Sequence, residues 1–248
     1  MVALPGARRD VGLTTMSIAR AASTLHKWLA LIVGVQILFW VASGAFFAIF
    51  PIERVRSEHR IAEHHHVLDA GTLRAPQEMA ALLPEAPTKL TYESDALGQP
   101  VAIAEFPARR AILIDLADWR IASPLSAESA QAIAQVYVAD SPRVREVRLV
   151  TEETPEYRGL LPAWRVAFDD AEGLAVYVAA DTGRVTARRS DLWRVYDALW
   201  ALHIMDWRDH ENFNTGLLIL ASLLALVVVV SGLVLTPYRM GWFRSGSR

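Results

Sequence analysis

Two long apolar runs lie near opposite ends of the chain, at residues 28–50 and 216–235, and the region between them alternates apolar and polar residues over short distances. Each run is long enough to cross a bilayer as a helix, which takes about 20 residues. The first run lasts 23 residues. A signal peptide has a shorter apolar core of about 7 to 15 residues, so we interpret this run as an uncleaved anchor. The pattern predicts transmembrane helices at 25–50 and 213–236, with Pro51 ending the first because proline has no backbone N–H.

The region between the two runs contains the same order of predicted elements twice. The second copy has one helix, three strands and a turn, at residues 126–137, 144–152, 163–168, 174–179 and 181–183. The first copy has the same order, at residues 76–83, 89–93, 101–106, 111–115 and 118–119. This self-similarity predicts two α+β units, 71–123 and 124–190, each with a helix packed on a small antiparallel sheet. The alternative is a chance alignment of two sets of amphipathic strands.

The segment 191–210, just before the second run, is amphipathic. Apolar positions recur every three or four residues and tryptophans every seven, at Leu192, Tyr196, Leu199 and His203 and at Trp193, Trp200 and Trp207. Tryptophan is enriched at the bilayer interface. We therefore predict an interfacial helix on the outer membrane surface, with His203 directed toward the lipid or the neighbouring helices. The alternative is a helix that packs under the soluble region, with the tryptophans in its core.

Small residues inside the two spans predict close packing between helices. Gly34, Ser43 and Gly44 lie in the first span, and Ser231 and Gly232 lie in the second. Helix backbones approach each other closely at such positions in lipid. The sequence leaves open whether the two spans pair with each other or with another protein.

Charge is divided between the ends and the middle of the chain. Residues 51–212 carry 26 of the 27 Asp and Glu but only 18 of the 25 Lys and Arg, a net charge of −8. The flanks, 1–24 and 237–248, are basic, and short basic flanks stay in the cytoplasm. The charges therefore predict a membrane protein with both termini cytoplasmic and the middle outside, which a linker at 51–70 joins to the first span.

Composition excludes several functions. The chain has no cysteine, so disulfides, thiolate chemistry and cysteine-ligated metals are excluded. It has no basic face that could bind nucleic acid. It also lacks a phosphate-binding glycine loop, a dinucleotide fingerprint, a nucleophile elbow and a zinc-protease motif. We therefore predict no enzyme activity for the chain on its own.

The densest group of candidate metal ligands is His64, His65 and His66, with His59 and Glu63 nearby. Side chains of adjacent histidines diverge, and no two of these histidines have the four-residue spacing with which a helix holds one ion. Weak binding of zinc, copper or nickel is one interpretation. A solvated linker outside the membrane is the interpretation we favour.

Several segments resemble a known family. Pro162–Val166, Val176–Val178 and Asp181–Val185 resemble the strand and turn signature of the PepSY domain, and Leu25–Trp28 and Leu202–His203 resemble the membrane helices that accompany it. Together these segments cover most of the chain, which therefore resembles a PepSY-associated transmembrane protein. The resemblance implies an α+β extracytoplasmic domain, with tandem PepSY-like units, flanked by two transmembrane α-helices.

The same resemblance implies two classes of function. Larger members of the family resemble ferric-siderophore reductases of the bacterial inner membrane, in which membrane histidines hold haem b. By this resemblance, His26 and His203 are the candidate haem ligands. Other PepSY proteins resemble inhibitory, chaperone-like or regulatory modules. This chain has two predicted spans rather than four or more, a departure from the reductase pattern.

The positions of the two histidines restrict haem binding. His26 belongs to the cytoplasmic side of one span and His203 to the outer side of the other, so they cannot share one iron. A further ligand is needed, from a second copy, another subunit, or Met205 or His210. We predict an accessory or haem-binding electron-transfer component of a redox or iron/metal-uptake system, with a membrane or periplasmic protein partner or as a homo-oligomer. The alternative is a cofactor-free, membrane-anchored regulatory or chaperone-like binding module.

Overall fold

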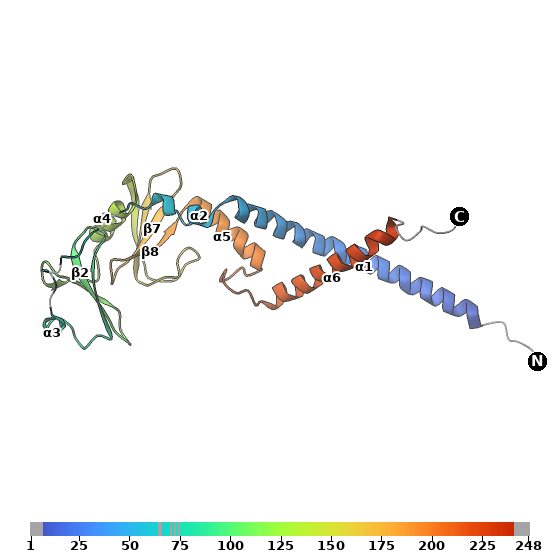
Figure 1. The fold of residues 1–248 in the computed structure, drawn as a ribbon, viewed down its shortest axis with the longest axis horizontal. Coiled ribbons are helices and arrows are strands. Elements are labelled where there is room, and N and C mark those ends of the chain that lie inside the picture. Colours follow the sequence, from blue (N-terminus) through green and yellow to red (C-terminus); the bar gives the residue numbers. More distant parts are fainter. Residues whose placement is uncertain (1–6, 64–65, 70, 72, 74, 241–248) are drawn as a thin grey trace, which may run out of the picture. The chain divides into compact units, whose positions relative to one another are not determined.

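The structure is a computed structural model that describes residues 7–63, 66–69, 71, 73 and 75–240 (Figure 1). The chain divides into two compact units. We call Phe50–Tyr196 the sheet unit, and Met1–Ile49 together with Asp197–Arg248 the helical unit. The sheet unit contains the eight strands of the described residues, and the helical unit contains the two apolar segments.

The sheet unit begins with two short helices, α2 (Ile52–Val55) and η1 (Glu58–Arg60). The chain after them joins the end of a later helix, α4 (Ala127–Tyr137), through two backbone hydrogen bonds. Ala62 N–H donates to the Tyr137 carbonyl (3.0 Å), and Ala139 N–H donates to the Arg60 carbonyl (2.9 Å). Part of the predicted linker at 51–70 is therefore an ordered component of the sheet unit.

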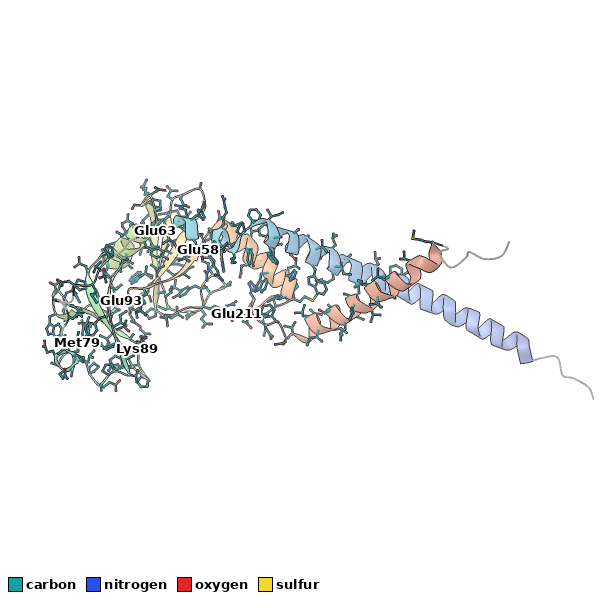
Figure 2. All side chains as sticks on the ribbon, viewed as in Figure 1. Glu58, Glu63, Met79, Lys89, Glu93 and Glu211 are labelled. Carbon is teal, nitrogen blue, oxygen red and sulfur yellow. The ribbon has the colours of Figure 1, made fainter. Side chains whose placement is uncertain are left out.

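The first sheet is an antiparallel meander of four strands in chain order, β1 (Lys89–Ser94), β2 (Pro100–Glu105), β3 (Ile112–Asp115) and β4 (Arg120–Ile121). Successive side chains of a strand point to opposite faces. One face carries Ala102, Ala104 and Ile114 and packs with Met79 of α3 (Pro76–Met79), which Figure 2 labels. The helix predicted at 76–83 ends at Met79, but the turns that follow place Leu83 in the same core.

The second sheet repeats the meander, with β5 (Val144–Val150), β6 (Ala163–Phe168), β7 (Ala175–Ala179) and β8 (Val185–Arg189). Strand β7 is buried along its whole length, between β6 and β8. The turn after β7 places Gly183 at φ +71°, a backbone conformation that glycine adopts without steric cost. The predicted strand positions are thus confirmed to within a few residues.

Helix α4 connects the two sheets through one core. Ser126 is its N-cap, because the Ser126 hydroxyl accepts the Ser129 N–H (3.2 Å). Its buried side chains Ala130, Ile133 and Ala134 belong to one apolar cluster with residues of both sheets: Val101, Ile103 and Leu113 of the first, and Val166, Phe168, Val176 and Val178 of the second. The helix lies against the second sheet in Figure 1. The second face of the first sheet is therefore buried by the same core.

The opposite face of the second sheet is covered by the β5–β6 loop and carries buried polar groups. The rings of Tyr157, from the loop, and Tyr177, from β7, are stacked with centroids 4.4 Å apart. The Tyr157 hydroxyl lies 2.8 Å from Thr186 Oγ1, and the Tyr177 hydroxyl donates to Glu156 Oε2 (3.0 Å). Burial would raise the pKa of Glu156, but the hydrogen bond and charge of Arg194 outweigh it, and the pKa is lowered.

The helical unit contains the long helix α1 (Ala7–Ile49), most of α5 (Asp191–Ile204), and α6 (Gly216–Arg239). Two segments are long and apolar enough to cross a membrane, Lys27–Ile49 and Gly216–Leu233, with mean hydropathies of 2.1 and 2.7. Only 11% and 6% of these segments are buried within the chain, whereas a core helix of a soluble protein is mostly buried. Such exposure suits lipid.

The three glycines predicted at close helix contacts lie in open space in the structure. A Cβ placed at Gly34, Gly44 or Gly232 would meet no atom within 4 Å. Among the described residues of the two helices, Val33 of α1 and Ala225 of α6 are buried, and Ser43 of α1 is buried beside His203 of α5. Within the described residues, therefore, the three glycines are not sites of close helix packing.

Candidate functional site around His203

His203 lies one residue before the end of α5 and contacts α1 within the helical unit. Its neighbours on α1 are Trp40, Ser43 and Phe47. These residues are three and four positions apart, so they lie on one face of the helix. Of the two predicted directions for the His203 side chain, the lipid and the neighbouring helices, the structure shows the second, with α1 as the neighbour.

The hydrogen bonds of Ser43 determine which ring nitrogen of His203 carries a proton. Ser43 is 1% exposed, and its hydroxyl lies 2.7 Å from both the Phe39 carbonyl and His203 Nδ1. A carbonyl only accepts, so the single hydroxyl proton goes to Phe39, and Nδ1–H donates to Ser43 Oγ. This assignment, inferred from the hydrogen bonds, leaves Nε2 unprotonated. Nε2 has no hydrogen-bond partner among the described residues.

Aromatic rings surround the His203 imidazole. The ring centroids of Phe47, Trp200 and Trp40 lie 5.5, 6.4 and 6.5 Å from it, and the Trp200 plane is nearly parallel, at 4°. Trp40 Nε1–H also donates to the His203 carbonyl (2.8 Å). That carbonyl belongs to the last turn of α5, where no helical N–H is available to it. The imidazole is thus fixed in orientation and shielded from water on several sides.

The loop after α5 is organised by one carboxylate. Asp206 accepts the backbone N–H groups of Arg208, Asp209, Glu211 and Asn212, at distances of 2.9 to 3.3 Å. These bonds, that of Asn212 the strongest, lower the pKa of Asp206 to about 2. Met205 adopts φ +54°, which ends α5 at Ile204. The segment predicted as one helix at 191–210 is therefore a helix followed by an Asp206-centred turn.

The loop contains a histidine, His210, which pairs with a carboxylate of α5. His210 Nδ1 lies 2.7 Å from Asp197 Oδ2, and the His210 carbonyl accepts Trp200 Nε1–H at 2.9 Å. Trp200 therefore contacts His203 with its ring and the loop with its N–H. Among the described residues, no group of three or more His, Asp or Glu is placed to hold a metal ion.

Comparison with protein families identifies the chain. The family model described as the PepSY-associated TM region matches residues 23–248. The chain belongs to this family. The match includes both apolar segments and both sheets, and with the exposed apolar helices it establishes a membrane protein with a PepSY-associated domain. Comparisons with curated proteins and with solved structures gave no significant match.

In this PepSY-associated protein, His26 lies far along α1 from the point at which His203 contacts that helix. His26 precedes Ser43, the hydrogen-bond partner of His203, by 17 residues on one continuous helix. A rise of about 1.5 Å per residue separates them by about 25 Å. The backbone of His26 is helical, but its side chain lies outside the described part of the structure. One iron ion cannot bind both histidines, in agreement with the sequence argument.

The histidine cluster is described only in part. His64 and His65 lie outside the described residues, and His66 is exposed beside Gly98. His59 pairs with Glu172 through Nε2 (3.2 Å). A metal site at His64–His66 stays a prediction.

Sequence reasoning did not identify Ser43 or Trp40 as partners of His203. The signal was present in the spacing of Gln36, Trp40, Ser43 and Phe47, which puts polar and aromatic groups on one face of an apolar span. Their partner could not be read from the sequence, because His203 is 160 positions away from Ser43.

Proposed function

We propose that this protein is an accessory component of a redox or iron/metal-uptake system that binds haem b through Nε2 of His203. The observation that carries the proposal is the hydrogen bond from His203 Nδ1 to Ser43. A metal-binding histidine characteristically donates its other ring N–H to a fixed acceptor, which sets the tautomer and orients the ring. His203 has that arrangement, with Nε2 left for a ligand.

Each residue at this site has a distinct role in the proposal. Ser43 holds the proton on Nδ1, while Trp40, Phe47 and Trp200 orient the imidazole and exclude water. Haem, when bound, supplies one-electron transfer; the polarity around it adjusts its potential. A haem held by His203 would need a further ligand, from a second copy, another subunit, or Met205 or His210 of this chain.

We further propose that the protein lies in a bacterial inner membrane with both termini cytoplasmic and the sheet unit periplasmic, as a tandem pair of PepSY-like modules. The acidic middle and basic flanks support this orientation. A reporter that is active only in the cytoplasm, fused after Ala139, should be inactive. Activity there would reverse the proposed orientation.

A cofactor-free regulatory or chaperone-like module is the second candidate function. One observation favours it: Ser43 and the aromatic rings hold the His203 ring in place without any ligand. In this case the His203 contact joins α5 to α1, and the sheet unit binds a partner protein.

A visible spectrum of the full chain, purified in detergent from haem-supplied cells, distinguishes the two functions. Haem binding predicts an intense band that His203→Ala abolishes. Ser43→Ala should reduce haem affinity about 10- to 100-fold, as loss of an outer-shell partner does. His66→Ala, at an exposed histidine of the sheet unit, should leave the band unchanged. A colourless but folded protein would exclude haem and leave the regulatory module.

A further inference from the structure

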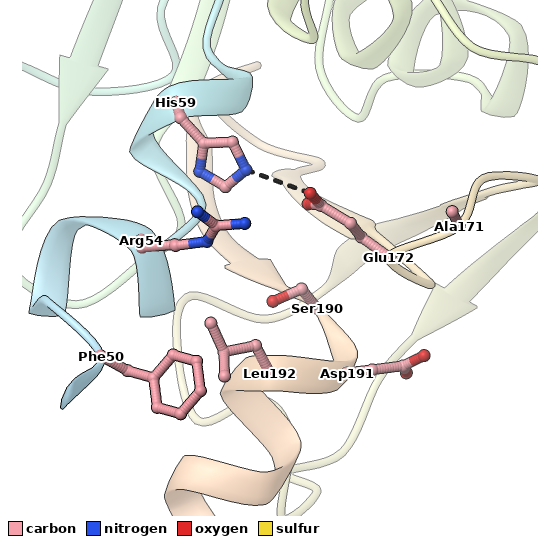
Figure 3. A pocket seen from close by; sticks show the side chains of 8 residues that line it. All are labelled: Phe50, Arg54, His59, Ala171, Glu172, Ser190, Asp191 and Leu192. Atoms are coloured by element: carbon pink, nitrogen blue, oxygen red, sulfur yellow. Dashed lines mark hydrogen bonds and ion pairs between the residues drawn. The ribbon is translucent and has the colours of Figure 1, made fainter. Parts of the chain in front are cut away.

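A pocket of about 250 Å³ lies inside the sheet unit, between the chain that follows α1 and the first turn of α5 (Figure 3). Phe50, Arg54 and His59 line it from the first segment. Glu172, Ser190 and Leu192 are among the residues that line it from the other side. The pocket thus combines charged groups with an apolar wall.

The acidic groups at the pocket already have cationic partners. Glu172 pairs with His59 Nε2 (3.2 Å) and with Arg60 Nη1 (3.3 Å). Asp191 pairs with Arg194 Nη1 (2.7 Å). Neither carboxylate therefore needs a cation from a ligand.

Unlike the two carboxylates, Arg54 has no ionic partner among the described residues. Figure 3 shows its guanidinium directed into the pocket, near His59 and Ser190. It has no carboxylate partner among the described residues, although it lies within an acidic region of net charge −8. A guanidinium presents a planar set of N–H donors that matches phosphate oxygens in pairs. The Arg54 guanidinium therefore makes this pocket suited to an anionic ligand.

The apolar side of the pocket indicates that the anion is attached to an apolar group. Phe50 and Leu192 line the pocket, and Phe50 directly follows Ile49, the last residue of the first apolar segment. Chain connectivity therefore places the Phe50 wall of the pocket one residue after the apolar segment, next to the expected membrane surface. Phospholipid headgroups are the most concentrated phosphates at that depth, and each is joined to an apolar body.

We infer that this pocket binds the phosphate of a membrane phospholipid, with Arg54 as donor and with Phe50 and Leu192 against the glycerol and acyl region. The bound lipid would fix the first turn of α5 and the segment after α1 to the membrane surface. This inference does not depend on haem binding, because it uses none of the residues around His203.

Native mass spectrometry of the full-length protein in detergent, with added dioleoyl phosphatidylglycerol, tests the inference. Arg54→Gln should lower the occupancy of the tightest lipid site about tenfold, which corresponds to loss of a hydrogen bond to a charged group. Arg56→Gln is the matched control, because Arg56 is also exposed and lies two residues away but does not line the pocket. Arg54→Lys should retain intermediate occupancy, because it keeps the charge without the paired donors.

The outcomes separate lipid binding from its alternatives. Equal lipid occupancy in Arg54→Gln and Arg56→Gln overturns the inference. Loss of lipid in Arg54→Gln together with full occupancy in Arg56→Gln supports it. Displacement of the lipid by millimolar inorganic phosphate alone would show a free-anion site and overturn the lipid assignment. Circular dichroism should show Arg54→Gln to be folded, since Arg54 has no ionic partner to lose.

Discussion

The hydroxyl of Ser43 lies 2.7 Å from Nδ1 of His203, although 160 positions separate the two residues in the chain. Ser43 belongs to an apolar helix and His203 to the last turn of α5. A single hydrogen bond of this kind contributes little free energy, but it can fix the orientation of a side chain, because few alternative partners exist in lipid. It defines both the position and the tautomer of the candidate ligand.

Loss of this contact should destabilise the helical unit by a modest amount. Ser43→Ala removes the acceptor of His203 Nδ1–H and should lower the free energy of unfolding by about 0.6–1.7 kcal/mol, the range for hydrogen bonds between membrane helices. Ser231→Ala is the matched control, because the Ser231 hydroxyl bonds only the Val228 carbonyl of its own helix. Equal stability of the two variants in a denaturant titration in detergent would contradict the contact. The ¹⁵N shifts of His203 should also show loss of the single tautomer.

The shared core predicts that the two sheets lose protection together. Ile133→Ala leaves a cavity where α4 contacts residues of both sheets and should cost about 2–5 kcal/mol. Amide hydrogen exchange should then accelerate in β2 and β3 as well as in β6 and β7. Met79→Ala removes a side chain that packs only with the first sheet and should accelerate exchange there first. A response of Ile133→Ala confined to the second sheet would indicate two separate cores.

Acid should weaken the sheet unit through Glu156. This carboxylate accepts hydrogen bonds from Arg194 Nε (2.7 Å) and from the Tyr177 hydroxyl (3.0 Å), and its pKa is lowered in the fold. A lowered pKa gives stability that is complete above the unfolded value, about 4.3, and disappears as pH falls through the folded value. The wild-type protein should therefore exceed Glu156→Gln in stability at pH 7, and the difference should shrink below about pH 4.3.

Urea unfolding of the two proteins at pH 7 and at lower pH measures this difference. Glu152→Gln is a suitable control, because Glu152 is exposed and has no ionic partner among the described residues. A difference between wild type and Glu156→Gln that stays constant through the acidic range would contradict the assignment.

The conformation of the loop after α5 should depend on the Asp206 carboxylate. Asp206→Ala removes the acceptor of four backbone N–H groups and should expose residues 205–212 to rapid proteolysis. Asp209→Ala, at an exposed carboxylate of the same loop, should leave the cleavage rate unchanged. Because the pKa of Asp206 is about 2, protection should persist in acid until the pH approaches that value. Equal cleavage rates of the two variants would show that residues other than Asp206 maintain the loop conformation.

Local patterns predicted most elements of the fold correctly. Strand β6 has the predicted bounds, Ala163–Phe168, because alternation and flanking turn residues define a strand without reference to its partners. Helix α4 begins after Ser126 as predicted, since a capping hydroxyl acts within three residues. The end of α5 was placed too late because the Asp206 turn uses backbone N–H groups whose availability no side-chain pattern reveals.

The sequence by itself determined the two apolar segments and the order of the strands, because segment length, periodicity and residue type act locally. The choice of His203 as a candidate ligand came from the family resemblance and stays a prediction. Tertiary structure alone decided that α4 closes one core with both sheets and that Ser43 meets His203. Such contacts join positions far apart in the chain. Their selection depends on which surfaces the folded elements present to one another, and a linear pattern does not contain that information.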